Sequence, residues 1–273
     1  MMKIKGTIVI VVALLLSLGN TKEALAAADH YGNNLESVYS YIGSELKDRP
    51  SEITVKVDSF KGTDILKLVG SRGLQTYESN NNINYDYEIY NVTGIKYTTK
   101  QISRNNKTVV EVKLYPSYRE TREQTDYVYQ KVNEILNSHS EVKNYSDAQK
   151  YSWIYDYIIS NVSYDYSMQN QSAYAALKSR STICGGYASL FYVFATELGL
   201  PCRIAYGTAS GIYHAWNLVK LNGEWYCADA TMGDAPGARD TYLLTSMNTI
   251  STHDIEDGFQ SEFVLASANY SSN

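Results

Sequence analysis

The sequence predicts an α+β protein in which a buried helix packs on an antiparallel sheet. Apolar residues recur at helical spacing over residues 187–198, and Gly199 followed by Pro201 is typical of the end of a helix. Three β-rich segments come next, and Asn222-Gly223 between the last two is the strongest two-residue hairpin signal. We expect strands over residues 202–207, 213–221 and 224–230.

Length and composition are those of an ordinary globular protein. The chain has 273 residues, of which 44% are hydrophobic and 19% are charged, and this length gives room for one or two domains. Its 26 tyrosines are spread over the whole length, and we interpret them as packing on sheet faces and interfaces.

The first 28 residues have the pattern of an export signal. Lys3 and Lys5 precede an apolar run over residues 8–16, and small residues follow over 24–28. The apolar run is shorter than the ~20 residues that a membrane span needs. We therefore expect cleavage near Ala26 to Asp29 and a secreted mature chain without a membrane span.

The charge balance argues against nucleic acid as a partner. Removing residues 1–28 takes away three lysines and one glutamate, which leaves 21 basic and 28 acidic residues. Nucleic acids and anionic membranes repel a net acidic chain. The sequence therefore predicts no nucleic-acid partner and no binding to an anionic membrane surface.

Residues 29–118 are predicted to form a small α+β region without a catalytic constellation. An amphipathic stripe from Leu35 to Leu46 predicts a helix that ends before Pro50. Alternating apolar residues over 53–57 predict a strand, and two longer β-rich runs are joined by a hairpin loop at Arg104 to Lys107. Those runs cover residues 92–102 and 108–115, and a short helix is expected over 64–69.

Residues 119–273 are predicted to form the catalytic domain, which begins with two helices. Thr121 and Gln124 have the spacing of a capping box at the start of a helix that ends at Ser138. A second helix is expected to start at Ser146-Asp147. Its inward-facing residues are expected to be Trp153, Ile154, Tyr157 and Ile158.

Cys184 is the candidate nucleophile. It stands at the N-terminal end of the predicted buried helix, where unpaired N–H groups and the helix dipole favour an anion. A thiol in this position ionises more easily, and the thiolate is the reactive form. Gly185 and Gly186 follow directly and would let a substrate backbone come close. The backbone N–H of Cys184 is the expected oxyanion donor, and Tyr164 and Tyr166 are candidates for a second donor.

The hairpin brings a histidine and an aspartate together. Residues on either side of the Asn222-Gly223 turn face each other, and the same register sets Trp216 opposite Asp229 and His214 opposite Thr231. These side chains then project to one side of the sheet. The Cβ atoms of His214 and Asp229 become diagonal neighbours roughly 7 Å apart or less.

Cys184, His214 and Asp229 thus fill the nucleophile, base and orienting roles of a catalytic triad. No C-x-x-C or H-x-x-x-H pair indicates a metal, and no glycine-rich phosphate loop indicates a cofactor. We interpret His253 as structural and Asp234 as a residue that orders a loop. Cys184→Ala is expected to fold normally, and His214→Ala and Asp229→Ala are expected to lose turnover without unfolding.

The sequence does not decide whether the other two cysteines form a disulfide. Cys202 and Cys227 are expected on neighbouring strands, where either a disulfide or two buried thiols would fit. With three cysteines in a secreted chain, at least one thiol is expected to be free.

Three ordered sequence blocks resemble the core of bacterial transglutaminase-like proteins. The blocks are Cys184 to Ala188, His214 to Val219 and Asn222 to Thr231, and the resemblance covers about residues 145–255. It implies a papain-like α+β fold and assigns the triad residues the same roles. Family members often have Thr-Trp where this chain has Thr231-Met232, and a residue other than cysteine is common at Cys227; both positions are expected to reshape the pocket wall.

Together with the export-signal pattern, the triad and the resemblance predict a secreted acyl-transfer enzyme, whose mechanism needs no cofactor. Thiolate attack on a glutamine carboxamide would release ammonia, and an amine or water would then complete cross-linking or deamidation. A cysteine peptidase or amidase is the alternative, because the same triad would hydrolyse amide bonds with water as acceptor. A non-catalytic cell-surface binding module is a third interpretation. The expected partners are protein or peptide substrates, including cell-wall and extracellular proteins.

Overall fold

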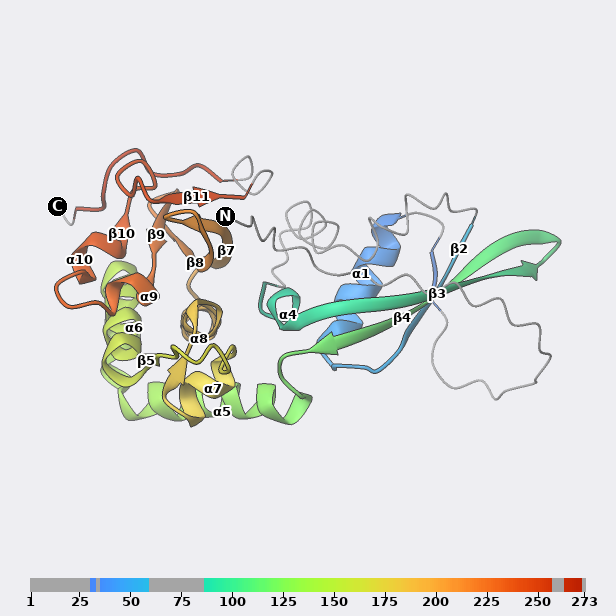
Figure 1. Cartoon of the computed structure of the whole chain (residues 1–273), viewed down its shortest axis with the longest axis horizontal. Coiled ribbons are helices and arrows are strands. Elements are labelled where there is room, and N and C mark those ends of the chain that lie inside the picture. Colours follow the sequence, from blue (N-terminus) through green and yellow to red (C-terminus); the bar gives the residue numbers. More distant parts are fainter. Residues whose placement is uncertain (1–29, 33–34, 59–85, 257–262, 272–273) are drawn as a thin grey trace. The chain divides into compact units, whose positions relative to one another are not determined.

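The chain divides into two units, Met1–Arg119 and Glu120–Asn273 (Figure 1). The computed structural model describes residues 30–32, 35–58, 86–256 and 263–271. The predicted export signal and the helix expected over residues 64–69 lie outside these ranges. Among the described residues, none of the helices combines the length and apolar character needed to cross a bilayer.

The first unit is a four-stranded sheet with helix α1 packed against it. The strand order is β1-β2-β4-β3, with β1 parallel to β2 and the other pairs antiparallel. Val38 and Ile42 of the helix share a core with Val55 and Val112 of the sheet. The elements are β1 (His30–Gly32), α1 (Leu35–Leu46), β2 (Ile53–Asp58), α4 (Asp86–Asn91), β3 (Val92–Arg104) and β4 (Lys107–Tyr118).

The hairpin between β3 and β4 confirms the predicted loop and tightens it to two residues. Arg104 pairs with Lys107, and Asn105 and Asn106 between them have φ values of 52° and 63°. Asparagine tolerates this left-handed conformation better than most residues, which explains the turn. Both strands extend beyond the predicted ends, and the short helix α4 is not predicted from the sequence.

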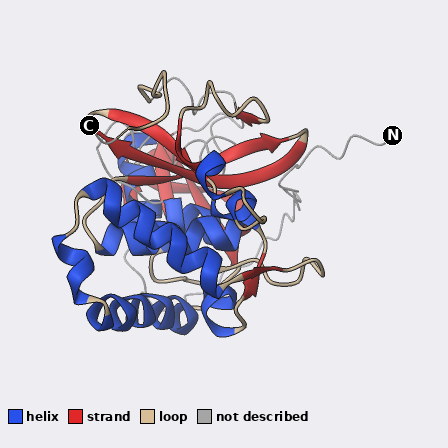
Figure 2. Cartoon of the chain, turned by 90° about the vertical axis from the view of Figure 1, so that its left-hand side faces the viewer, coloured by secondary structure: helices blue, strands red, loops and turns tan. Residues whose placement is uncertain are grey.

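The second unit contains a five-stranded sheet with the long helices on one side of it (Figure 2). The strand order is β10-β9-β8-β7-β11, and every neighbouring pair is antiparallel. The helical elements are α5 (Arg122–Ser138), η1 (Ser140–Asn144), α6 (Asp147–Asn161), α7 (Ala173–Lys178), α8 (Cys184–Glu197), α9 (Ala230–Gly233) and α10 (Arg239–Tyr242). The strands are β5 (Ser163–Tyr164), β6 (Ser181–Thr182), β7 (Cys202–Ala209), β8 (Ile212–Leu221), β9 (Glu224–Ala228), β10 (Leu243–Thr245) and β11 (His253–Ile255).

Both predicted helix starts are confirmed. Thr121 and Gln124 form the capping box of α5, and Ser146 and Gln149 form an equivalent box at α6. The inward face of α6 is only partly as predicted. Besides Ile154 and Ile158, its buried residues are Tyr151 and Tyr155, whereas the predicted Trp153 and Tyr157 are half-buried and pack on Phe194.

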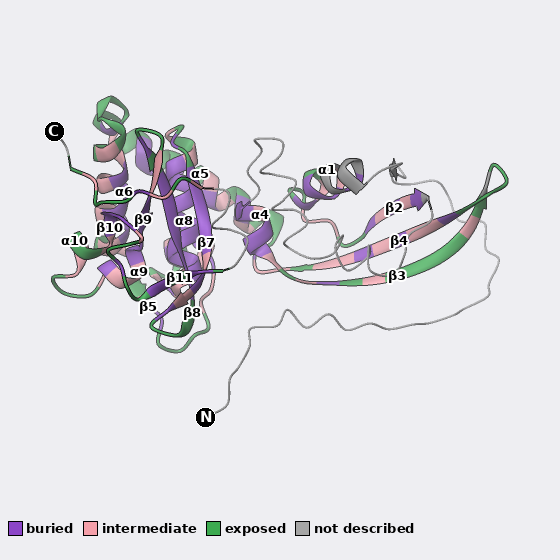
Figure 3. Ribbon diagram, turned by 90° about the horizontal axis from the view of Figure 1, so that it is seen from above, coloured by how far each residue is buried: buried purple, intermediate pink, exposed green. Residues whose placement is uncertain are grey.

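Helix α8 is the centre of the second unit. It packs on β7 and β8 on one side and contacts α5, α6 and α7 on the others. Every residue over 185–195 is buried, so the helix is enclosed all round rather than along the single face that the sequence predicts (Figure 3). Its predicted end is confirmed: Gly199 has φ 72°, and the N–H of Leu200 donates to Ala195 O at 2.9 Å.

Gly186 has a packing role that the sequence analysis does not foresee. A Cβ at this position would lie 1.9 Å from Oγ1 of Thr182, a buried β-branched residue with little freedom to move. We expect Gly186→Ala to destabilise the protein by about 1–3 kcal/mol through overpacking, as measured by thermal unfolding. Gly94→Ala is the control, because a Cβ there meets nothing within 4 Å. Equal melting of both variants would contradict this role.

Candidate active site

Cys184 is the first residue of α8, and the residue before it leaves this helix end uncapped. Ile183 is the N-cap, with φ −94° and ψ 179°, and its apolar side chain makes no capping hydrogen bond. Its side chain therefore does not compete with a developing negative charge for the first N–H groups of α8. Cys184 is partly exposed, as a nucleophile that meets a substrate must be, whereas Cys202 and Cys227 are buried.

A short two-stranded ladder leads the chain into the nucleophile. Tyr164 on β5 pairs with Thr182 on β6, two residues before Cys184. Burial and then the charge of Cys184 raise the pKa of the Tyr164 hydroxyl. Tyr166 is 89% exposed. Of the two candidates for the second oxyanion donor, Tyr164 has the better position.

The β8–β9 hairpin has the predicted register near its turn. Asn222 and Gly223 both have positive φ values, of 52° and 90°, and Leu221 pairs with Glu224. The ladder then continues only as far as Ala228, the last residue of β9.

The predicted pairing fails beyond Ala228 because the chain turns into a helix. Asp229 is the N-cap of α9, and Thr231 lies inside that helix, so Thr231 does not stand opposite His214 on a strand. The predicted contact between histidine and aspartate nevertheless forms. His214 Nε2 lies 2.8 Å from Asp229 Oδ2, with both side chains almost completely buried.

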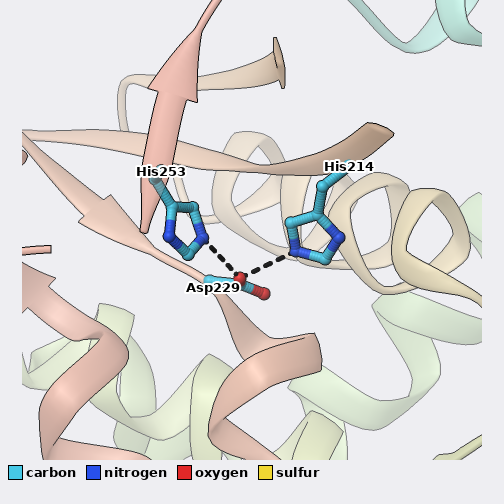
Figure 4. A group of neighbouring side chains, drawn as sticks. All are labelled: His214, Asp229 and His253. Atoms are coloured by element: carbon cyan, nitrogen blue, oxygen red, sulfur yellow. Dashed lines mark hydrogen bonds and ion pairs between the residues drawn. The ribbon is translucent and has the colours of Figure 1, made fainter. Parts of the chain in front are cut away.

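The Asp229 carboxylate accepts four hydrogen bonds. Oδ1 accepts from the backbone N–H groups of Thr231 at 2.9 Å and Met232 at 3.1 Å. Oδ2 accepts from His214 Nε2 and, at 2.9 Å, from His253 Nε2 (Figure 4). Four donors satisfy the lone pairs of a buried carboxylate, which is the condition for keeping it ionised away from water.

These contacts shift the pKa values of His214 and Asp229 in opposite directions. Burial alone would lower the pKa of His214, but its hydrogen bonds and charge interactions with Asp229 and Cys184 outweigh burial and hold this pKa well above its ordinary value. Burial alone would raise the pKa of Asp229, but the donors on its oxygens hold it well below its ordinary value. A charged imidazolium facing a carboxylate is therefore the favoured state at neutral pH.

His214 also connects the carboxylate to the candidate nucleophile. The neighbouring Cys184 side chain contributes to the raised pKa of His214, and because Nε2 is bonded to Asp229, Nδ1 is the nitrogen left for the thiol. Cys184, His214 and Asp229 thus form a chain of interacting groups. Such a chain can move a proton from the thiol to the imidazole and later from the imidazole to a leaving group.

His253 belongs to this group, although sequence reasoning treats it as merely structural. It lies on β11, which pairs antiparallel with β7 and places His253 opposite Ala209. A three-residue strand that follows an irregular segment and pairs at the sheet edge leaves no local signal. Only knowledge of the β7–β11 pairing could have placed this histidine beside Asp229.

Of the residues that the structure describes, His214, Asp229 and His253 form the group that could hold a metal ion. Their ligand atoms lie within 4.8 Å of one another. Nε2 of His214 and Nε2 of His253 are each hydrogen-bonded to Asp229 Oδ2, and these bonds account for the short distances. The sequence search for paired ligands does not find this group, because its members come from three separate segments.

The two buried cysteines do not face each other. All three cysteines are free thiols, and β8 separates the strands that carry Cys202 and Cys227. Cys202 pairs with Val219, and Cys227 pairs with Leu218. The expectation of neighbouring strands is therefore wrong, and two buried thiols are the state that the sheet adopts.

Asp234, which follows α9, is hydrogen-bonded to a tyrosine of α8. Its Oδ2 accepts a hydrogen bond of 2.9 Å from the Tyr187 hydroxyl, one turn after Cys184. A second tyrosine supports the triad aspartate from the other side, because the Tyr155 hydroxyl donates to the carbonyl oxygen of Asp229 at 2.8 Å. A Cβ on Gly233 would lie 1.6 Å from this hydroxyl, so only glycine fits there.

Comparison with known proteins gives one family. Residues 136–230 match the model of the transglutaminase-like superfamily. Kyphoscoliosis peptidase of Mus musculus is 28% identical over 140 residues, and that of Homo sapiens is 27% identical over 140 residues. Each alignment covers 42% of this chain and 21% of the relative, so the chain spans about a fifth of the length of these curated relatives. A solved TGase structure aligns with a TM-score of 0.36 at 15% identity, over 74% of this chain and 59% of its own.

Proposed function

We propose that the chain is a Cys-His-Asp acyl-transfer enzyme that works through a thioester on Cys184, because residues 136–230 match the model of the transglutaminase-like superfamily. The observation that carries this proposal is the 2.8 Å hydrogen bond between His214 and Asp229 beside Cys184, which is the first residue of a helix without a side-chain cap. The favoured substrates are glutamine side chains of proteins or peptides, and the favoured reactions are cross-linking and deamidation.

Before the first half of the reaction, His214 already holds the proton of the thiol as an imidazolium, and the Cys184 thiolate then attacks the carboxamide carbon. The negative charge that develops on the carbonyl oxygen is stabilised by the backbone N–H of Cys184, with the Tyr164 hydroxyl as the candidate second donor. The His214 imidazolium then gives its proton to the leaving nitrogen, and ammonia departs. The product is a thioester between Cys184 and the acyl group.

In the second half, His214 acts as base for the acceptor. A lysine amine that loses its proton to His214 attacks the thioester and gives an isopeptide bond, whereas water gives the carboxylic acid. In both cases the sulfur leaves and the imidazolium is available to reprotonate it. Asp229 keeps the imidazolium stable and correctly oriented throughout, and it does not itself take up a proton.

A cysteine peptidase or amidase is the second candidate. The observation that favours it is the name of the two relatives, which are described as peptidases. The same groups would cleave a peptide bond if the leaving nitrogen belonged to the substrate backbone and water were the acceptor. Which reaction dominates depends on whether the site excludes water from the thioester.

We further propose that the enzyme acts outside the cell, on cell-wall or extracellular proteins. The support for this is the basic, apolar and small-residue pattern of residues 1–28 together with the acidic balance of the remainder.

A glutamine-containing peptide, incubated with the purified chain with and without a primary amine, tests the proposed reaction. We expect ammonia release together with an amine adduct or deamidated peptide in the mass spectrum. Cys184→Ala should abolish all of these products, and Cys202→Ala, which removes a buried thiol at the start of β7, should retain them. Cleaved peptide without ammonia would instead support the peptidase. If Cys184→Ala leaves the biological effect unchanged and no product forms, the chain is a binding module.

A further inference from the structure

We infer that His253 is a positioning residue of the acyl-transfer centre, which holds the Asp229 carboxylate in the orientation that His214 requires. This inference rests on the proposed function. Neither the family match nor the triad chemistry assigns this histidine a role, yet its Nε2 and that of His214 bond to the same carboxylate oxygen, Oδ2 (Figure 4).

The position of His253 is fixed by strand pairing and ring packing. Strand β11 approaches β7 so closely that a Cβ on Gly207 would lie 1.9 Å from Asp254 O. The His253 side chain is 0% exposed. Its ring stands edge-on to Trp216, with ring centroids 4.9 Å apart, and edge-on to His214 at 5.7 Å. The ring therefore has no room to swing away from the carboxylate.

The hydrogen bonds of His253 determine which nitrogen carries the proton. An ionised carboxylate has no proton to donate, so the proton between Nε2 and Asp229 Oδ2 must be on the histidine. On the other side of the ring, the Thr252 hydroxyl lies 3.0 Å from Nδ1 and can donate to it. Together the two contacts select the tautomer that donates to Asp229.

The hydrogen bond that His253 donates to Asp229 also affects His214. With two donors on Oδ1 and two on Oδ2, the carboxylate can neither rotate nor take up a proton without breaking a hydrogen bond in a buried site. Loss of the His253 donor leaves one lone pair of Oδ2 unsatisfied. The carboxylate then becomes easier to rotate or protonate, and its support for the His214 imidazolium weakens.

Three variants distinguish a hydrogen-bond role from simple space filling. His253→Phe keeps a ring in the same space and removes the donor. His253→Gln places an amide N–H near the position of Nε2 and restores the donor. Thr252→Val removes the hydroxyl that selects the tautomer and leaves the ring in place. The readout is the rate of Cys184 carbamidomethylation by iodoacetamide at neutral pH, followed by intact mass on the full chain, with unfolding curves recorded in parallel.

We expect His253→Phe to slow the labelling of Cys184 about tenfold, because a hydrogen bond to a charged group is lost. His253→Gln should recover most of the wild-type labelling rate. Thr252→Val should be labelled at a rate between those of the His253→Phe and His253→Gln variants. Wild-type rates in all three variants, or equal loss in the Phe and Gln variants, would overturn the inference. If His253→Phe fails to fold, the Gln and Thr252→Val variants decide in the same way.

The same experiment separates this inference from the proposed function. If wild-type Cys184 reacts no faster than the thiol in His214→Ala, the acyl-transfer centre itself is wrong. If wild-type Cys184 reacts much faster than in His214→Ala, but the His253 variants match wild type, only the positioning role is wrong.

Discussion

His214→Ala is expected to slow acyl transfer by about 100- to 10,000-fold, the usual contribution of a general acid and base. The imidazole interacts with the Cys184 side chain and is hydrogen-bonded to Asp229, so its removal leaves the thiol without its base and the leaving nitrogen without its proton donor. The measurement is kcat/KM for ammonia release from a glutamine peptide.

His139→Ala is the matched control. This histidine lies at the end of α5, and its Nδ1 contacts Ile135 O within its own helix, outside the hydrogen bonds of the site. It should retain the wild-type kcat/KM. If His214→Ala retained more than about a tenth of wild-type turnover while folded, His214 could not be the base of the reaction.

Asp229→Asn is expected to lower kcat by roughly 1,000- to 10,000-fold. The amide nitrogen would face Nε2 of His214 and of His253, and an N–H donor cannot accept their protons. Both rings would have to adopt the opposite tautomer. His214 would then carry its proton on Nδ1, toward Cys184, and could no longer accept the proton of the thiol.

Asp229→Asn is also expected to shift the pH dependence of kcat/KM toward lower pH. In the wild type, Asp229 and Cys184 hold the pKa of His214 well above its ordinary value, so the imidazolium is lost only as the pH rises through that raised value. Removing the carboxylate charge lowers the pKa of His214. The alkaline fall in the residual kcat/KM of Asp229→Asn should therefore move to lower pH, and an unchanged or higher alkaline limb would contradict the electrostatic role of Asp229.

Asp229→Ala is expected to unfold more easily, in contrast to the expectation from sequence. The carboxylate caps α9 through two backbone N–H groups and accepts from two buried histidines. Losing a cap costs about 1 kcal/mol, and removing one partner of a buried charged pair costs about 3–5 kcal/mol. Matched thermal melts of the Asn and Ala variants separate this structural loss from the catalytic one.

Local patterns predicted the parts of the site that depend on local rules. The capping box at Thr121 and Gln124, the end of α8 at Gly199 and the tight turn at Asn222-Gly223 all follow from residues within a few positions of one another. Because that turn fixes the start of the β8–β9 ladder, the sequence alone predicts that His214 lies near Asp229.

Non-local pairing accounts for most of what the sequence did not predict. The position of His253 depends on β11 adding to the far edge of β7, and the separation of Cys202 from Cys227 depends on β8 lying between their strands. Neither strand order is encoded near those residues. The change from strand to helix at Asp229 was missed for a different reason, because alternation alone continues a strand until a capping residue is considered.

The most direct test of the central claim is the site-resolved rate of thiol alkylation. Iodoacetamide is added to the folded chain at neutral pH, and intact and peptide masses are followed for wild type, His214→Ala and Cys184→Ala. The account predicts a single fast adduct on Cys184, strongly slowed in His214→Ala and absent in Cys184→Ala, while the buried Cys202 and Cys227 serve as internal references and stay unmodified. Labelling of Cys184 at the same rate with and without His214 would contradict it.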